Sequence, residues 1–336
     1  MLNLLNRGMR TARGRRVAFY LGVDGGGTRT RAVLVSGEGR IRGTGEAGPS
    51  NYHNVGLEVA GRQLKQAVDA AWAAAGLDPR PAAAAFLGCA GVRSSADAAH
   101  MVSVAEGLAL APPGAVRVEN DLHNALAGGL AGRPGIALIA GTGSNCLGRD
   151  STGATFMCGG WGWLLDDEGA AMGLALGGLR AAARSADGRG PSTPLQASAL
   201  ALLGLSEVDE LLARLYAEKW TVDEIAAFAP VVTRHAAAGD PTARGLLERG
   251  AAALGDLVAG VARKLDFPGG PEVVLLGGCV RSGPPYQPMV EAAVRTACPA
   301  ARLVEPAHPP LTGAAINVLR YAGIDVPATL TESAAP

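Results

Sequence analysis

The first part of the chain alternates short apolar runs with glycine-rich turns, a pattern typical of β-strands. Residues 17–23 predict a buried strand, and the alternating residues 28–35 predict a second strand after three consecutive glycines. A turn at "SGEG" leads to a third short strand from about Arg40. The stretch 56–75 then has the spacing of an amphipathic helix. The opening segment therefore predicts a strand meander followed by a helix.

The next segment alternates strands with helices. We expect strands over 84–91 and 115–120 and a helix over 94–108. A short helix over 121–130 is expected to begin directly where the second of these strands ends. Strands that alternate with helices are typical of proteins with a largely parallel sheet. The predicted fold class is α/β.

The opening pattern returns 116 residues later, where Gly141 takes the place that Gly25 holds in the first copy. Residues 135–160 again predict a strand, a Gly-Thr-Gly loop, a strand, a turn and a third strand. Self-similarity of this kind indicates a duplicated unit. After a mostly helical stretch that ends near Leu265, we expect a buried strand over 271–278, a helix over 286–298 and a closing helix within 308–323.

Composition indicates a globular protein with two domains. The 336 residues are 48% hydrophobic, which is enough apolar material for two ordinary cores. The first sixteen residues hold five arginines and no acid, and we expect this basic leader, 1–16, to be disordered. The rest of the chain has 25 basic against 30 acidic residues, a net charge of −5, which excludes a nucleic-acid binder. No apolar run is long enough to span a membrane.

The five cysteines show no spacing typical of metal ligands. They are Cys89, Cys146, Cys158, Cys279 and Cys298. Four of them lie in or beside apolar, strand-like runs. We therefore expect buried free thiols and a reducing, cytoplasmic environment.

Two matched loops combine glycines with a threonine after a buried strand. Such loops present backbone N–H groups to anions, since glycine permits positive φ and a close approach of the backbone. Asp24 precedes the first loop, and a carboxylate beside phosphates requires a cation such as hydrated Mg²⁺. Alone, either loop equally fits a hairpin with a glycine bulge, and neither matches G-x-G-x-x-G or a P-loop. The predicted nucleotide-binding residues are Asp24, Gly25, Gly26, Gly27, Thr28, Gly141, Thr142, Gly143, Gly277 and Gly278, with Ser144 beside them.

Six motifs together resemble a known family. They are "GVDGGGTRT", "PSNYH", "VENDLHNALAG", "IALIAGTGSNC", "CGGWGWLLDDEGAAMG" and "VVLLGG". The chain resembles, from residue 17 to about 322, the N-acetylglucosamine kinase group of the BadF/BadG/BcrA/BcrD-type ATPases. This group belongs to the superfamily of sugar kinases, heat-shock chaperone ATPases and actin. The resemblance implies two ribonuclease-H-like (actin-like ATPase) domains with a cleft between them, ATP on the glycine loops and a sugar deep in the cleft.

Domain limits follow from the duplication together with the resemblance. We place the first domain at 17–132 and the second, with a helical insertion, at 133–311. We expect the closing helix, 312–323, to pack back on the first domain, and residues 324–336 to form a tail. We also expect a homodimer.

Asp121 is the candidate general base. It ends an apolar strand and opens a helix, so its position alone favours a helix N-cap. The resemblance implies instead that its carboxylate takes a proton from the sugar hydroxyl, a role that typically contributes about 10²–10⁴-fold in rate.

Other polar residues also have two interpretations. Asn51 fits an Asx-turn, Asn145 fits a plain strand position, and Asp166 and Asp167 fit helix capping and compensation of the helix dipole. The two tryptophans of "CGGWGWLLDDEG" suit either a sugar ring or core packing. The resemblance implies sugar contacts from Asn51, Asp121, Gly143, Asn145, Gly160 and Asp167.

The implied activity is an ATP-dependent phosphorylation of the 6-hydroxyl of an amino sugar, with N-acetylglucosamine as the first candidate. Glucosamine kinases and N-acetylmuramic acid kinases share the scaffold. A different class is the BadF-type ATPase activator of a dehydratase or reductase, which needs cysteine ligands for an iron–sulfur cluster. Cys146 and Cys158 lie inside the sugar-kinase motifs instead, which disfavours an activator.

Overall fold

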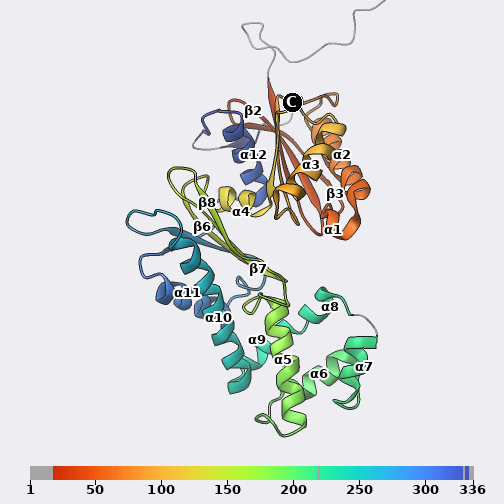
Figure 1. The fold of residues 1–336 in the computed structure, drawn as a ribbon, viewed down its shortest axis with the longest axis vertical. Helices are drawn as coiled ribbons and strands as arrows, with labels where there is room; N and C mark the ends of the chain where they lie inside the picture. Colours follow the sequence, from red (N-terminus) through yellow and green to blue (C-terminus); the bar gives the residue numbers. More distant parts are fainter. Residues whose placement is uncertain (1–17, 218–219, 328–329, 333–336) are drawn as a thin grey trace, which may run out of the picture. The chain divides into compact units, whose positions relative to one another are not determined.

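A computed structural model describes residues 18–217, 220–327 and 330–332, so the basic leader lies outside the described residues. The chain divides into two compact units (Figure 1). Unit 1 comprises the residues up to Arg133 together with those from Pro306 onward, and unit 2 comprises Pro134–Glu305. None of the helices in the described ranges is both long and apolar enough to cross a membrane.

Unit 1 is built on a six-stranded mixed sheet in the order β11-β3-β2-β1-β4-β5. Its first three strands form the predicted antiparallel meander, and β4 and β5 then add in parallel beside β1. The strands are β1 (Phe19–Gly25), β2 (Thr30–Ser36), β3 (Arg40–Ala47), β4 (Ala84–Cys89), β5 (Val116–Asn120) and β11 (Thr331–Glu332). The last is a two-residue strand that pairs with β3 inside the stretch expected as a tail.

Helices cover both faces of this sheet. Side chains alternate along β2, so that Leu34 faces a core shared with α2 and α3, while Val33 and Val35 face a core shared with α12. Helix α12 also packs on α4 and lies so close to β1 that a side chain at Gly22 would begin 2.6 Å from the Ala314 backbone. The helices are α1 (Tyr52–Val55), α2 (Leu57–Ala74), α3 (Ser95–Gly107), α4 (Leu122–Gly129) and α12 (Pro310–Tyr321).

Unit 2 contains a five-stranded mixed sheet in the order β10-β9-β6-β7-β8. Its strands are β6 (Gly135–Ala140), β7 (Ser144–Arg149), β8 (Thr155–Gly159), β9 (Glu272–Leu276) and β10 (Arg302–Val304). The β6-β7-β8 meander, with β9 parallel to β6, repeats the arrangement of β1-β2-β3 with β4. The predicted duplication of strands is therefore confirmed.

Helices build most of the rest of unit 2 and bury one large apolar core against the sheet. They are α5 (Ala171–Ala186), α6 (Leu195–Leu203), α7 (Glu210–Ala217), α8 (Val222–Ala226), α9 (Ala229–Ala237), α10 (Pro241–Ala262) and α11 (Tyr286–Ala297). The predicted α/β class is confirmed. The five cysteines are all free, and Cys89, Cys146 and Cys298 are buried, whereas Cys158 and Cys279 are half-buried.

Candidate functional site

The carboxyl ends of three neighbouring parallel strands of unit 1 carry the predicted polar residues. Strands β1, β4 and β5 run side by side, so the segments that follow Asp24, Cys89 and Asn120 emerge at one edge of the sheet. A bond from the Ala90 N–H to the Gly25 carbonyl (2.7 Å) ties the first two segments together. In open α/β sheets this edge is where ligands bind.

The first glycine loop is held by its own backbone and by the segment before α1. The Gly26 N–H donates to the Arg29 carbonyl (2.9 Å), and the Ser50 N–H donates to the Gly26 carbonyl (3.1 Å). A side chain at Gly25 would begin 2.8 Å from the buried Ser50 hydroxyl, so that glycine is needed for packing. Gly27 is different: it is exposed, and a Cβ there would meet no protein atom within 4 Å.

Most of these loop glycines do not use the positive φ that glycine permits. Among the predicted loop glycines, only Gly277 (φ 96°) and Gly160 (φ 70°) have left-handed backbone. The others use glycine for close contact or for open space rather than for its unusual conformation.

Asp24 is half-buried and already partnered. Its Oδ2 accepts from the Arg31 guanidinium at 2.6 Å, and its Oδ1 lies 3.4 Å from the Asn124 amide nitrogen. That amide nitrogen also donates to the Val23 carbonyl (2.9 Å). The described residues hold no group of three or more potential metal ligands. Asp24 therefore fits a hydrated cation that also contacts phosphates, and it does not fit a cation held by protein ligands alone.

Asp121 stands at the N-cap position of α4, but its side chain makes no cap hydrogen bond. Asn120 does the capping instead, since its Oδ1 accepts from the Leu122 N–H at 3.0 Å. Burial, and secondarily the charge of Asp24, raises the pKa of Asp121 to about 6. Asp121 thus occupies the N-cap position, as its place in the sequence predicts, but without a side-chain cap hydrogen bond, and backbone N–H groups only partly oppose the rise in its pKa.

Asn51 begins α1 and forms the Asx-turn, with its Oδ1 accepting from the His53 N–H at 3.2 Å. The amide also packs on the loop after β4, because a side chain at Gly91 would begin 2.5 Å from the Asn51 Oδ1. The turn engages Oδ1, whereas Nδ2 has no hydrogen-bond partner among the described residues.

The second glycine loop is seated on the first turn of α5. The Ala171 and Met172 N–H groups donate to the Gly141 and Thr142 carbonyls at 2.9 and 3.0 Å, which satisfies two N–H groups at the helix start. The segment that follows β9 lies beside the second glycine loop, since the Cys279 N–H donates to the Ala140 carbonyl at 3.1 Å. Gly141 and Gly278 resemble Gly27, because a Cβ at either would meet no protein atom within 4 Å.

Asp167 is a buried carboxylate with left-handed backbone (φ 71°), which is strained for a residue with a side chain. Its Oδ1 accepts from the Ser144 N–H (2.6 Å) and lies 3.2 Å from the Ser144 hydroxyl. Burial raises the pKa of Asp167, and the two Ser144 contacts oppose that shift. A side chain at Gly143 would begin 3.0 Å from its Oδ2. Helix capping is wrong for Asp166 and Asp167, since α5 starts after Ala170 without a side-chain cap bond.

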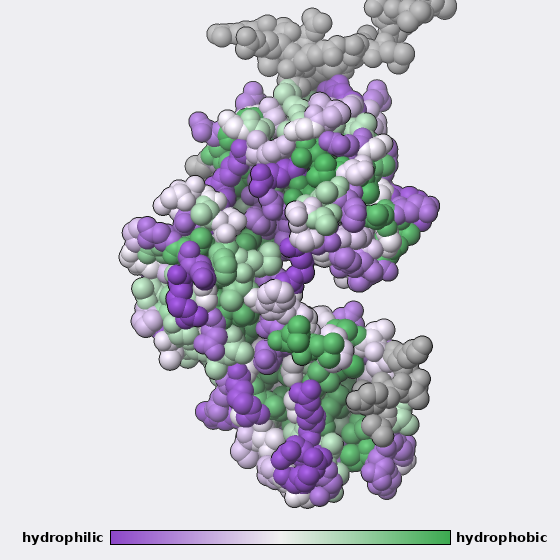
Figure 2. All heavy atoms as spheres, viewed as in Figure 1, coloured by the Kyte–Doolittle hydropathy of each residue, from purple (hydrophilic) through white to green (hydrophobic). Residues whose placement is uncertain are grey.

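The remaining predicted residues of unit 2 lie on β7 and in the segment after β8. Asn145 stands on β7, where its Oδ1 accepts from the Cys146 N–H (2.9 Å) and its Nδ2 lies 3.5 Å from the Met157 sulfur. Gly160 opens a turn whose Trp161 and Trp163 are 68% and 43% exposed, so core packing of these rings is wrong. Figure 2 shows apolar surface over the start of α5, in the region of this turn.

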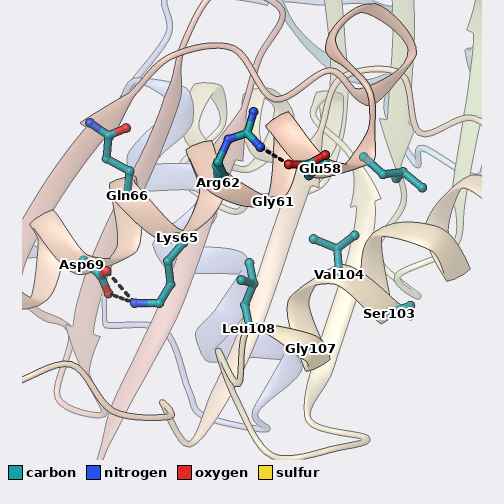
Figure 3. Close-up of a pocket in the computed structure, with 11 residues that line it drawn as sticks. Glu58, Gly61, Arg62, Lys65, Gln66, Asp69, Ser103, Val104, Gly107 and Leu108 are labelled. Atoms are coloured by element: carbon teal, nitrogen blue, oxygen red, sulfur yellow. Dashed lines mark hydrogen bonds and ion pairs between the residues drawn. The ribbon is translucent and has the colours of Figure 1, made fainter.

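One groove of unit 1 lies away from its predicted site residues. A groove of about 630 Å³ lies between α2 and α3, lined by apolar side chains and by charges that are already paired (Figure 3). Glu58 pairs with Arg62, and Lys65 pairs with Asp69 at 2.5 Å. The charges of this groove thus pair with one another, and none of the predicted site residues lines it.

Two contributors to the site, Arg31 and Asn124, escape the motif analysis, and the role of a third differs from its expected one. Arg31 and Asn124 hold Asp24 in place, and Ser144, grouped in the sequence with the nucleotide loop, turns its N–H and hydroxyl toward Asp167. A polar Asn124 in the apolar "LHNALAG" helix is the one signal that points to such a role, since buried amides require partners.

Comparisons with known proteins agree with this geometry. The family model described as "BadF/BadG/BcrA/BcrD ATPase family" matches residues 21–317. An N-acetylmuramic acid/N-acetylglucosamine kinase of Clostridium acetobutylicum is 30% identical over 69% of this chain and 76% of its own length. An N-acetyl-D-glucosamine kinase of Dictyostelium discoideum is 28% identical over 90% of this chain and 98% of its own.

Solved structures show the same fold. A protein of Chromobacterium violaceum, provisionally named an N-acetylglucosamine kinase, superimposes with a TM-score of 0.69 at 28% identity over 90% of this chain and 99% of its own. A glucokinase of the ROK family from Streptomyces griseus, in complex with glucose and AMPPNP, covers 90% of this chain and 100% of its own at a TM-score of 0.52 and 20% identity. This chain has the fold of sugar kinases of the actin-like ATPase type, and it belongs to the BadF/BadG/BcrA/BcrD ATPase family.

Proposed function

We propose that the protein is an ATP-dependent kinase that phosphorylates the 6-hydroxyl of an amino sugar, with N-acetylglucosamine as the first candidate. The observation that carries this proposal is Asp121, a carboxylate with a raised pKa and no side-chain cap hydrogen bond, at the sheet edge that also holds Asp24 and the first glycine loop. The names of the relatives support the substrate class, and they also leave glucosamine and N-acetylmuramic acid as alternatives.

We assign the phosphates of ATP to the glycine loops. In unit 1 the contacts come from Asp24 through Thr28, and in unit 2 from Gly141 to Gly143 with Gly277 and Gly278. The open space at Gly27, Gly141 and Gly278 supports this assignment, because the fold itself gives no steric reason for glycine there. Mg²⁺, held through water by Asp24, would neutralise charge on the phosphates. The ion pair with Arg31 orients the Asp24 carboxylate.

We assign the sugar to polar groups of both units. Asn51 can donate from its unused Nδ2, and Asp167 can accept from sugar hydroxyls through Oδ2 while Oδ1 stays on Ser144. Asn145, Gly143 and Gly160 complete the proposed contacts. A buried, pre-oriented carboxylate binds a hydroxyl strongly, since hydrogen bonds to charged groups contribute about 1.5–3 kcal/mol.

The chemical step is then a simple proton and phosphoryl transfer. As the sugar oxygen bonds to the γ-phosphorus, the hydroxyl proton moves to the Asp121 carboxylate, and the bond from that phosphorus to the β–γ bridging oxygen breaks to release ADP. Positioning of the hydroxyl beside a base, together with neutralisation of phosphate charge, accounts for catalysis of this kind.

An ATP-consumption panel tests the proposal directly. The sugars are N-acetylglucosamine, glucosamine, N-acetylmannosamine, N-acetylmuramic acid and glucose, each with a no-sugar control. We expect strong stimulation by one amino sugar and a phosphate ester at its 6-position by NMR. ATP hydrolysis that is independent of every sugar, together with iron in the purified protein, would instead identify an ATPase activator.

The rate should depend on pH through Asp121. A raised pKa means that the carboxylate becomes protonated, and useless as a base, as pH falls through about 6. We expect kcat/KM for the sugar, measured from pH 5 to 8 at saturating Mg-ATP, to be nearly flat above pH 7, to be halved near pH 6 and to fall about fivefold more between pH 6 and pH 5. Asp121→Asn should lose this limb and keep any limb that arises from titration of ATP. A flat wild-type profile down to pH 5 would count against Asp121 as the base.

Asp167→Asn should separate sugar binding from folding. Asn still accepts from the Ser144 N–H and tolerates left-handed backbone, so thermal stability should change little. Loss of the charge should raise the sugar KM about tenfold, with kcat reduced less. The matched control is Asp166→Asn. The Asp166 carboxylate accepts from the Trp161 N–H (3.2 Å), and its replacement should leave the sugar KM within twofold. Equal effects from the two variants would remove Asp167 from the sugar site.

A further inference from the structure

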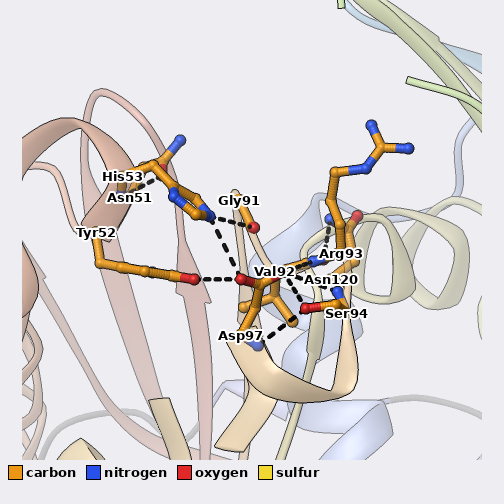
Figure 4. Close-up of polar contacts among 9 residues, drawn as sticks. All are labelled: Asn51, Tyr52, His53, Gly91, Val92, Arg93, Ser94, Asp97 and Asn120. Carbon is orange, nitrogen blue, oxygen red and sulfur yellow. Dashed lines mark hydrogen bonds and ion pairs between the residues drawn. The ribbon is translucent and has the colours of Figure 1, made fainter. Parts of the chain in front are cut away.

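A polar cluster in unit 1 joins segments that lie far apart in the sequence. Its centre is Asp97, the third residue of α3 (Figure 4). The Asp97 Oδ2 accepts from the Ser94 N–H at 2.8 Å and the Arg93 N–H at 3.0 Å, which completes the capping box of α3. This local role uses only one of the two carboxylate oxygens.

The second oxygen reaches across to α1. The Tyr52 hydroxyl donates to the Asp97 Oδ1, and the His53 Nε2 lies 3.6 Å from the same oxygen. The His53 Nε2 is also 3.1 Å from the Gly91 carbonyl, so it carries the proton and donates. A helix cap requires none of these contacts, since Tyr52 is 45 residues away from Asp97.

The bridged segments are the ones that carry the proposed sugar-side groups. Asn51 directly precedes Tyr52 and packs on Gly91, where glycine with φ 86° leaves no room for a side chain. The same loop after β4 accepts from the Asn120 amide through the Val92 carbonyl (2.9 Å). Asn120 precedes Asp121, so the Gly91–Ser94 stretch is the common support of Asn51 and Asp121.

We propose that Asp97 is a positioning residue for the sugar site. By contacting Tyr52 and His53, it keeps them against the loop after β4 and so holds Asn51 in place. The inference rests on the proposed function. The four-residue helix α1 is too short to be stable alone, so its position depends on such contacts. The contact raises the pKa of Tyr52 to about 12 and lowers that of Asp97, so the donor stays protonated and the acceptor ionised near neutral pH.

Tyr52→Phe is the sharpest test, because it removes the hydroxyl contact to Asp97 while the His53 contacts and the capping box stay intact. Loss of a hydrogen bond to a charged group should let Asn51 shift, and we expect the sugar KM to rise about tenfold. The ATP KM and kcat should stay within about threefold, a split that a general loss of folding would not produce. Tyr321→Phe is the matched control: it removes a hydroxyl that donates to the Gly114 carbonyl (3.1 Å) in the same unit and should change none of these values.

A double-mutant cycle gives an independent readout. If Tyr52 acts through Asp97, then Tyr52→Phe in an Asp97→Ala background, which has no acceptor for the Tyr52 hydroxyl, should raise the sugar KM by less than twofold. An unchanged sugar KM for Tyr52→Phe in an active enzyme, or additive effects in the cycle, would overturn this inference and leave the proposed function standing. A wild-type protein that phosphorylates no amino sugar would overturn the proposed function, and this inference with it.

Discussion

Replacing Asp121 with Asn should lower kcat by about 10²–10⁴-fold, the range typical of a lost general base, while the sugar KM stays within about threefold. Asn has nearly the same shape, so binding geometry persists, but its amide cannot take the hydroxyl proton. The raised pKa of Asp121 reflects a carboxylate that burial and the charge of Asp24 destabilise. Removing that charge should therefore leave thermal stability unchanged or slightly higher.

The neighbouring residue, Asn120, should show the opposite behaviour, because its replacement should reduce stability. Asn120 accepts from the Leu122 N–H and donates to the Val92 carbonyl, both in buried surroundings. Asn120→Ala leaves these groups without a partner, which should reduce the free energy of unfolding by about 1–3 kcal/mol. Thermal melts and steady-state kinetics on the two variants thus separate chemistry from structure. If Asp121→Asn lost stability while kcat stayed within tenfold, Asp121 would be a structural residue.

Much of the fold is predictable from apolar runs and glycines. The β1-β2-β3 meander and its repeat in β6-β7-β8 follow from strands whose buried positions alternate or run continuously. The elements that the pattern misses are α1, β10 and β11, each of four residues or fewer. Such short elements have little intrinsic stability, and contacts with distant residues, such as Tyr52 with Asp97, decide whether they form.

The candidate site is only partly predictable for the same reason. Motif residues such as Asp24 and Asp121 stand at strand ends, where the sequence pattern alone indicates a functional edge. Their partners cannot be found this way, since Asn124 meets the Val23–Asp24 segment across about 100 residues of chain. Nor does the sequence distinguish glycines that pack, such as Gly25, from glycines that face open space, such as Gly27.

That distinction makes Gly27 the most informative glycine to change. We expect Gly27→Val to reduce kcat/KM for ATP by about 10²-fold, because a branched side chain on the loop would keep phosphates from the backbone N–H groups, and a displacement of about 1 Å can cost that much. The backbone of Gly27 is not left-handed, and a Cβ there meets no protein atom within 4 Å. The variant should therefore fold with wild-type thermal stability.

Two further glycines complete this experiment. Gly107, at the end of α3, also faces open space without left-handed backbone, so Gly107→Val should leave both stability and ATP kinetics unchanged. Gly25→Val should instead destabilise the fold, because its side chain would begin 2.8 Å from the Ser50 hydroxyl and 3.3 Å from the Cys89 sulfur. The affinity of the Gly27→Val variant for the sugar, measured by calorimetry without ATP, should match that of the wild type. Wild-type ATP kinetics in a folded Gly27→Val protein would place the nucleotide away from this loop, and Asp24 would then have no phosphate-bound cation to hold.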